Sequence, residues 1–200
     1  MFQLRDQEFE DKEFVFENDV VNYLGPNLTL KQCRLILRTS SRGLVLSSVN
    51  LDNCEIFAKK KLANVKGWCR AEISKCTFRG KYFSNDFGYW PLYSDAGSME
   101  ACDFTEAILD DCRFFNCKVL DMKFPKWPCF TILHPVENFK ALKALDWTDG
   151  QAEYMDLFAS PEDNKGLSAI VNLASEFLKV NGGLEVELRD RLSRLDFVLL

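Results

Sequence analysis

The sequence has no run of about 18 consecutive apolar residues, so it contains no candidate membrane-spanning helix. Its first eleven residues are polar and acidic, whereas a secretory signal peptide needs a basic start and an apolar centre. We therefore expect a cytoplasmic protein with no membrane partner. The content of 47% hydrophobic and 28% charged residues is typical of a globular chain.

Motifs that bind nucleotides or metals are also missing. No P-loop, Gly-x-Gly-x-x-Gly or Cys-x-x-Cys sequence occurs among the 200 residues. The one histidine, His134, stands beside Pro135 without a nucleophile-elbow serine, so we expect a structural role for it. We expect the adjacent carboxylates Asp110 and Asp111 to form a solvated face. These absences predict a non-enzymatic protein with no catalytic residue, cofactor or metal.

The charges are unevenly distributed, although the net charge is only −5. Residues 1–27 contain seven acidic and two basic residues, residues 28–124 contain eleven and fifteen, and residues 125–200 contain twelve and eight. A mildly basic middle therefore separates two acidic ends, which indicates three regions. The basic run Lys59–Lys61 is too short to indicate nucleic-acid binding, so nucleic acid is not an expected partner.

A five-residue period runs through the middle of the chain. From Gly97 the sequence reads GSMEA CDFTE AILDD CRFFN CKVLD MKFPK, with a small or apolar first residue and a large apolar third residue in each quintet. Residues two apart on an extended chain point to the same side, whereas an α-helix would scatter these positions. The pattern predicts extended segments joined by corners, which stack as coils of parallel strands. The alternative is a β-sandwich of alternating strands.

Less regular quintets continue the pattern upstream, at Leu28/Leu30, Cys33/Leu35, Val49/Leu51, Cys54/Ile56, Ala71/Ile73 and Cys76/Phe78. Together the quintets resemble the A(D/N)LXX-like repeat of the pentapeptide-repeat family over residues 28–124, about half of the chain. Few second positions, among them Asn50 and Asp103, carry the Asp or Asn that the family favours, so the chain resembles a divergent member. The resemblance implies a right-handed quadrilateral β-helix that binds a partner rather than catalyses a reaction.

The spacing also predicts which residues stack. A square coil needs about twenty residues, and quintets begin at close to that interval, at Leu28, Val49, Ala71, Gly97 and Cys117. The next quintets then place four cysteines in one column, Cys33, Cys54, Cys76 and Cys102, beside a column of large residues, Leu35, Ile56, Phe78, Phe104 and Phe124. We expect the thiols to be buried packing residues of low reactivity. A disulfide or metal role is the alternative, because stacked coils bring cysteines within disulfide range.

Insertions between coils should emerge on one side of the solenoid, which is often the binding face of repeat proteins. The longest, residues 84–96, combines aromatic and acidic residues of the kind found at interface hot spots. We predict a partner-binding site there, formed by Asp86, Phe87, Tyr89, Trp90, Tyr93 and Asp95. The alternative is that the aromatic side chains fold back onto the solenoid as a plug.

The two ends of the repeat region should cover the open ends of the solenoid. We expect an N-terminal cap over residues 1–27, a β-helix over 28–130 and a C-terminal α-helical segment over 131–200. A helical period predicts four helices, at about 136–145, 148–158, 167–180 and 184–198. These helices either pack over the end of the β-helix or mediate association.

The resemblance implies a protein partner and leaves several functions open. We favour an inhibitor or immunity protein that neutralises a toxin or effector enzyme by direct binding. A DNA mimic that protects a topoisomerase (gyrase) is a second possibility, which the positive net charge of residues 28–124 opposes. A general adaptor is a third. A sugar-active β-helical enzyme would need paired carboxylates in a groove, and the sequence reveals no such pair.

Overall fold

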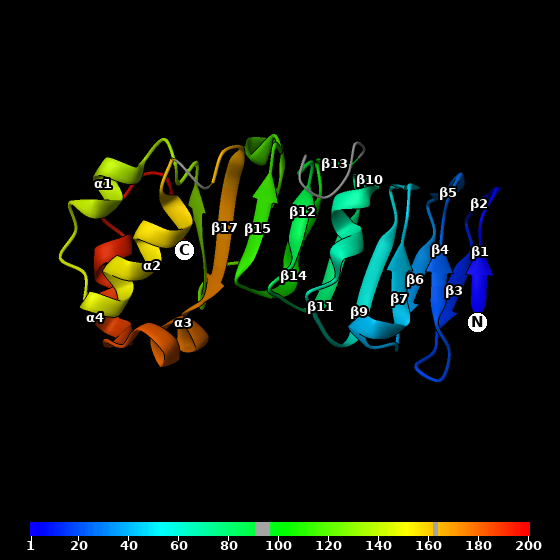
Figure 1. Cartoon of the computed structure of the whole chain (residues 1–200), viewed down its shortest axis with the longest axis horizontal. Coiled ribbons are helices and arrows are strands. Elements are labelled where there is room, and N and C mark those ends of the chain that lie inside the picture. Colours follow the sequence, from blue (N-terminus) through cyan, green and yellow to red (C-terminus); the bar gives the residue numbers. More distant parts are fainter. Residues whose placement is uncertain (91–96, 162–163) are drawn as a thin grey trace.

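Parallel coils of short strands form most of the molecule. The computed structural model describes residues 1–90, 97–161 and 164–200 and shows a mainly-β protein, a β-solenoid of about four turns followed by helices. Figure 1 shows an elongated molecule with the N-terminal strands at one end and the helices at the other. The predicted fold class is therefore confirmed.

Three parallel sheets make up the walls of the solenoid. The first contains β1 (Phe2–Leu4), β4 (Asn22–Leu24) and β7 (Leu44–Leu46). The second contains β2 (Gln7–Glu10), β5 (Leu28–Lys31), β8 (Val49–Asp52), β10 (Ala71–Ser74) and β13 (Ser98–Glu100). The third contains β3 (Glu13–Phe16), β6 (Arg34–Leu37), β9 (Glu55–Ala63), β11 (Thr77–Phe83) and β14 (Asp103–Asp110).

The register of the second sheet confirms the predicted stacking. Leu28 pairs with Val49, and Val49 pairs with Ala71, so residues about 21 apart in the sequence are neighbours in space. Gln7 pairs with Leu28 in the same column, which places residues 1–27 in the solenoid as its first coil. The segment expected as a separate N-terminal cap therefore extends the walls, because β1, β2 and β3 continue all three sheets.

Left-handed residues turn the chain at the corner between the second and third sheets. Five of them have φ between 51° and 53°, namely Asp11, Gln32, Asn53, Lys75 and Ala101. This conformation is unfavourable for residues other than glycine unless the surroundings support it. Hydrogen bonds between coils supply that support, because each of the first four donates its N–H to a carbonyl of the next coil, at 2.9 to 3.1 Å.

The cysteine column lies directly after these corners, as predicted. Cys33, Cys54, Cys76 and Cys102 are at most 2% exposed. Each thiol also lies 3.2 to 3.4 Å from the carbonyl oxygen of the residue two positions before it, so it makes a weak hydrogen bond across the corner. Burial raises the pKa of the Cys102 thiol to about 12, which keeps it protonated and unreactive.

Stacked phenylalanine rings fill the centre of the solenoid beside the cysteines. The ring centroids of Phe78 and Phe104 are 4.4 Å apart and nearly parallel, and those of Phe104 and Phe124 are 6.4 Å apart. All three side chains belong to one continuous buried core. The predicted column of large residues is therefore confirmed.

The C-terminal region differs from the expected helical segment over 131–200. A fourth sheet has the order β12 (Asp86–Gly88), β15 (Cys112–Phe115), β17 (Leu167–Leu173), β16 (Cys129–Leu133) and β18 (Val198–Leu199). The predicted helix over 167–180 is wrong for its first half, because β17 pairs antiparallel with β15 and with β16. Six of the seven residues of β17 are buried, and a strand covered on both faces has no alternating pattern in the sequence.

Four helices cover the outer face of this last sheet: α1 (Phe139–Lys143), α2 (Asp149–Ala159), α3 (Ala174–Asn181) and α4 (Glu185–Leu192). The helices α1, α2 and α4 lie close to three of the predicted helices. The helix α3 corresponds to the second half of the helix predicted over 167–180. Together with Phe130 and Ile170 of the sheet the four helices enclose a second apolar core. The helices therefore pack over the C-terminal end of the solenoid, as Figure 1 shows. No helix in the described ranges is both long and apolar enough to cross a membrane.

The burial of the thiols generates a test of this packing. All eight cysteines are unbonded and buried, so we expect none to react with Ellman's reagent within minutes in the folded protein at pH 8. All eight should react at once in concentrated guanidinium chloride, which serves as the control. Rapid reaction of several thiols in the absence of denaturant would show that the column is not packed as described.

Candidate functional site

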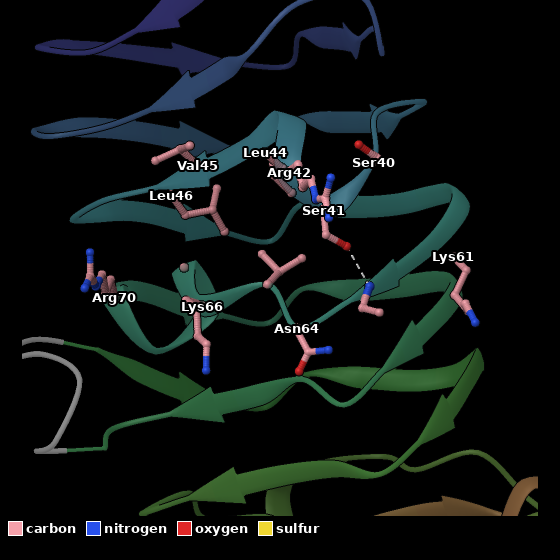
Figure 2. Close-up of a pocket in the computed structure, with 13 residues that line it drawn as sticks. Ser40, Ser41, Arg42, Leu44, Val45, Leu46, Lys61, Asn64, Lys66 and Arg70 are labelled. Carbon is pink, nitrogen blue, oxygen red and sulfur yellow. Dashed lines mark hydrogen bonds between the residues drawn. The ribbon is translucent and has the colours of Figure 1, made fainter.

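A groove lies where the first sheet of the solenoid ends. That sheet stops at β7, and at the next level of the solenoid the short helix η2 (Lys66–Arg70) packs against β7. The groove has a volume of about 880 Å³ and is lined by β7, η2, the end of β9 and the short helix η1 (Ser41–Gly43). Figure 2 shows these side chains from both walls of the groove.

Tight packing fixes the shape of the groove. Its floor consists of buried apolar residues, among them Leu44, Leu46 and Val65. The N–H of Ala63 donates a hydrogen bond of 2.7 Å to the Ser41 hydroxyl, which joins the end of β9 to η1 (Figure 2). Gly67 is needed in η2, because a Cβ atom there would lie 2.6 Å from the Cβ atom of Leu46. The groove is therefore a built feature rather than a gap between loops.

Basic side chains dominate the rim of the groove. Arg42, Lys61, Lys66 and Arg70 are all exposed, and none of the 13 lining residues is acidic. Within the described part of the chain, Arg42, Lys61 and Arg70 form no salt bridge. Figure 2 shows Lys66 and Arg70 projecting from η2 and Arg42 from the opposite wall. The groove thus concentrates positive charge, and among the described residues Arg42 and Arg70 have no salt-bridge partner for theirs.

The third sheet shows the opposite arrangement, because its charges are matched between coils. An alternating ladder joins Glu13, Arg34, Glu55, Arg79 and Glu106, with nitrogen–oxygen distances of 2.9 to 3.2 Å between successive members. Arg38 and Glu17 form a further pair at 2.9 Å. The solenoid therefore pairs charges where successive coils place them side by side, and the groove is a clear exception.

The sequence contains a signal for this groove that is independent of the aromatic insertion. The bases of the ladder have acidic partners about one coil away, as in Arg34 with Glu13, which is 21 residues earlier. Positions one coil from Arg42 and Lys61 are not acidic: residues 21 before them are Val21 and Ser40. Insertions between the quintets after Leu35 and after Ile56, which precede the longest one, supply the walls of the groove.

The predicted aromatic site in residues 84–96 is partly built into the core. Phe87 is fully buried and stacks on Phe114 at 5.0 Å, so it acts as the plug described in the alternative. Asp86 accepts two hydrogen bonds from the Arg113 guanidinium, at 2.7 and 3.0 Å, and its side chain is 12% exposed. These two residues therefore hold the insertion to the solenoid and present little surface to a partner.

Of the other members of that site, the structure describes Tyr89 and Trp90, which are both half-buried. Trp90 is half-buried and its ring stacks on Phe115 at 4.4 Å, while the N–H of Tyr89 donates to the Phe115 carbonyl at 3.0 Å. Tyr93 and Asp95 lie outside the described residues. A role for Tyr89, Trp90, Tyr93 and Asp95 in binding a partner stays a prediction.

Comparisons with known proteins do not assign a function to the groove. No known protein family, curated protein or solved structure gives a significant match to the chain. Among the residues that the structure describes, no group of three His, Cys, Asp or Glu side chains is arranged to hold a metal ion. His134 contacts Glu137 at 3.1 Å.

The contacts of Asp86 generate a prediction about stability. Replacing Asp86 with Ala removes both hydrogen bonds from Arg113, so we expect the free energy of unfolding to fall by about 2 kcal/mol, measured by urea denaturation. Glu17→Ala is the control, because it removes a salt bridge whose side chains are half exposed and should change stability little. Equal effects of the two substitutions would contradict a structural role for Asp86.

Proposed function

We propose that this chain is a non-enzymatic binding protein whose solenoid holds an acidic surface of a protein partner in the basic groove. The observation that carries the proposal is that Arg42, Lys61 and Arg70 are exposed in the groove and form no salt bridge with any described residue, on a scaffold that pairs its charges elsewhere. Unpaired charge in a concave site attracts a partner of opposite sign and accelerates encounter with it. Guanidinium groups such as those of Arg42 and Arg70 suit carboxylates, because they bind them with two parallel hydrogen bonds.

The scaffold best supports the inhibition of a toxin or effector enzyme by direct binding to it. Stacked coils with a continuous core are rigid, and a rigid surface loses little entropy when it docks. The resemblance of the quintets to pentapeptide repeats supports the same class of binding protein. The eight unpaired thiols support action in a reducing compartment such as the cytoplasm.

Mimicry of DNA is not supported by the groove. A DNA mimic needs an acidic surface, whereas the charged residues that line the groove are all basic. Binding of nucleic acid is also not favoured, because a few basic side chains contact too few phosphate groups for strong binding at physiological salt. A labelled duplex and a labelled single strand should both fail to bind the protein at that salt concentration.

The experiment first identifies the partner that co-purifies with the full chain from its own cells. The complex is then reconstituted from the two purified proteins. We expect a 1:1 complex by analytical ultracentrifugation and loss of the partner's enzymatic activity at stoichiometric addition. The double variant Arg42→Glu/Arg70→Glu should weaken binding about 100-fold, because it places like charges against the acidic surface.

The double variant Lys118→Glu/Lys126→Glu is the matched control. It changes the net charge equally, and both lysines are exposed outside the groove. We expect it to bind the partner within about threefold of the unmodified chain. Equal loss in both variants would contradict the groove as the site, and full activity of the saturated partner would contradict inhibition.

A further inference from the structure

The N-terminal end of the solenoid carries three strand edges that no described strand pairs. β1, β2 and β3 are the terminal strands of the first, second and third sheets. Figure 1 shows them at the end of the molecule opposite the helices. The N–H and C=O groups along such an edge can form hydrogen bonds with a further strand from another chain.

The C-terminal end of the solenoid is covered instead. β17 pairs antiparallel with β15, and the helices pack over the last sheet. Asp110 and Asp111, which were expected to form a solvated face, are half-buried at this junction, where Asp110 accepts a hydrogen bond of 3.1 Å from the N–H of Leu173. The N-terminal end is therefore where the parallel stack is open for a further strand.

The backbone of β3 directs hydrogen-bonding groups toward this open end. The carbonyl group of Phe16 accepts a hydrogen bond of 2.9 Å from the N–H of Arg38 in the second coil. Successive residues of a strand direct their N–H and C=O groups to opposite sides. The groups of Glu13 and Val15 therefore point away from the second coil, and both residues are exposed.

The charge ladder of the third sheet ends at this edge with room for one more base. Inside the ladder, Glu55 contacts two arginines, Arg34 and Arg79, each at 3.2 Å. Glu13 at the N-terminal end forms a salt bridge with Arg34 and with no other described residue. Its side chain is 52% exposed, against 27% for Glu55. A glutamate in this column thus holds a base from each adjoining coil, and Glu13 has only one adjoining coil.

The strand β6 shows what kind of segment fits β3. It pairs parallel with β3, and its sequence Arg-Leu-Ile-Leu is followed by Arg38. Its two arginines contact Glu13 and Glu17, at 3.2 and 2.9 Å, and its two leucines lie in register with Phe14 and Phe16. The complementary segment therefore has two basic residues four positions apart, with apolar residues between them.

Phenylalanine rings give the open end an apolar surface. Phe9 and Phe14 are half-buried and contact each other edge to face, with ring centroids 5.2 Å apart. Phe2 is 39% exposed, and its ring centroid lies 5.8 Å from that of Phe16. Apolar side chains of an added segment can pack on these rings, as the leucines of β6 do from the other side.

The charge of this end distinguishes between two possible occupants. Residues 1–27 contain seven acidic and two basic residues. The ends of two copies of this chain would therefore repel each other, and acidic side chains on edge strands are a common protection against self-association. A basic segment is instead attracted to the same edge.

We propose that β3 binds an extended basic segment of a partner protein as an added parallel strand. One basic side chain of the segment lies at Glu13 and a second, four residues later, lies at Glu17. The apolar side chains between them pack on the phenylalanine rings, and the main chain forms hydrogen bonds with Glu13 and Val15. This edge does not depend on the basic groove, which has the opposite charge.

A labelled peptide that copies β6 tests this proposal. The probe is fluorescein-labelled Ser-Arg-Leu-Ile-Leu-Arg-Thr amide, which has the sequence of residues 33–39 with serine in place of Cys33. Its binding to the full chain is measured by fluorescence anisotropy. In the control peptide, glutamine replaces both arginines. We expect the arginine peptide to bind at least tenfold more tightly than the control. No binding of the arginine peptide, or equal binding of the two peptides, would overturn the proposal.

Glutamate variants of the chain locate the bound peptide. Glu13→Gln/Glu17→Gln should weaken binding about tenfold, because it removes both charges that face the arginines. Glu106→Gln is the matched control, since Glu106 is an exposed glutamate at the other end of the ladder and also pairs with one arginine. It should leave binding within twofold. Equal binding by the double variant and the unmodified chain would contradict this location.

A proline variant tests the added strand itself. Val15→Pro removes an N–H that points to the open end and leaves the hydrogen bonds between β3 and β6 in place, so the melting temperature should change by no more than a few degrees. We expect it to abolish binding of the arginine peptide, whereas unchanged binding in the folded variant would contradict strand addition. Sedimentation should show a monomer of the unmodified chain. A dimer that Val15→Pro dissociates would show that a second copy occupies the edge and would overturn the proposal.

Discussion

Parallel stacking of coils about 21 residues long is the constraint on which the rest of the structure depends. It makes each residue the neighbour of the residue one coil before and one coil after it. Identical residue types then accumulate in columns, as the cysteines and phenylalanines do in the interior. Opposite charges alternate on the outside, as they do from Glu13 to Glu106. The two interior columns and the outer charge ladder all follow from one repeat length.

The same constraint explains why the ends of the solenoid matter. A parallel stack has a free edge at each end, and a free edge invites pairing with another chain. At the C-terminal end β17 runs antiparallel to β15 and ends the parallel stack on that wall, while the helices cover the outer face. The junction between these two architectures is where Asp110, Asp111 and Asn172 are brought together from distant parts of the sequence.

The repeat predicts the solenoid well because its signal is local and repeated many times. The columns at Cys33 to Cys102 and Phe78 to Phe124 could be read directly from five-residue spacing. The strand β17 could not, since a segment buried on both faces shows neither period, and its pairing with β15 spans more than 50 residues. The groove has no motif of its own in the sequence. Its basic residues differ from those of the ladder only because no acidic residue stands one coil length away from them. The plug formed by Phe87 depends on tertiary contacts that an aromatic-rich insertion does not reveal.

In the proposed complex, the positive charge of the groove meets the acidic surface of the partner. Hydrogen–deuterium exchange of the chain, alone and in the purified complex, tests it most directly, because the method reports which backbone amides the partner covers. We expect new protection in residues 40–46 and 61–70, the two walls of the groove, and little change along the charge-matched third sheet. Protection confined to the third sheet or to the C-terminal helices would contradict it.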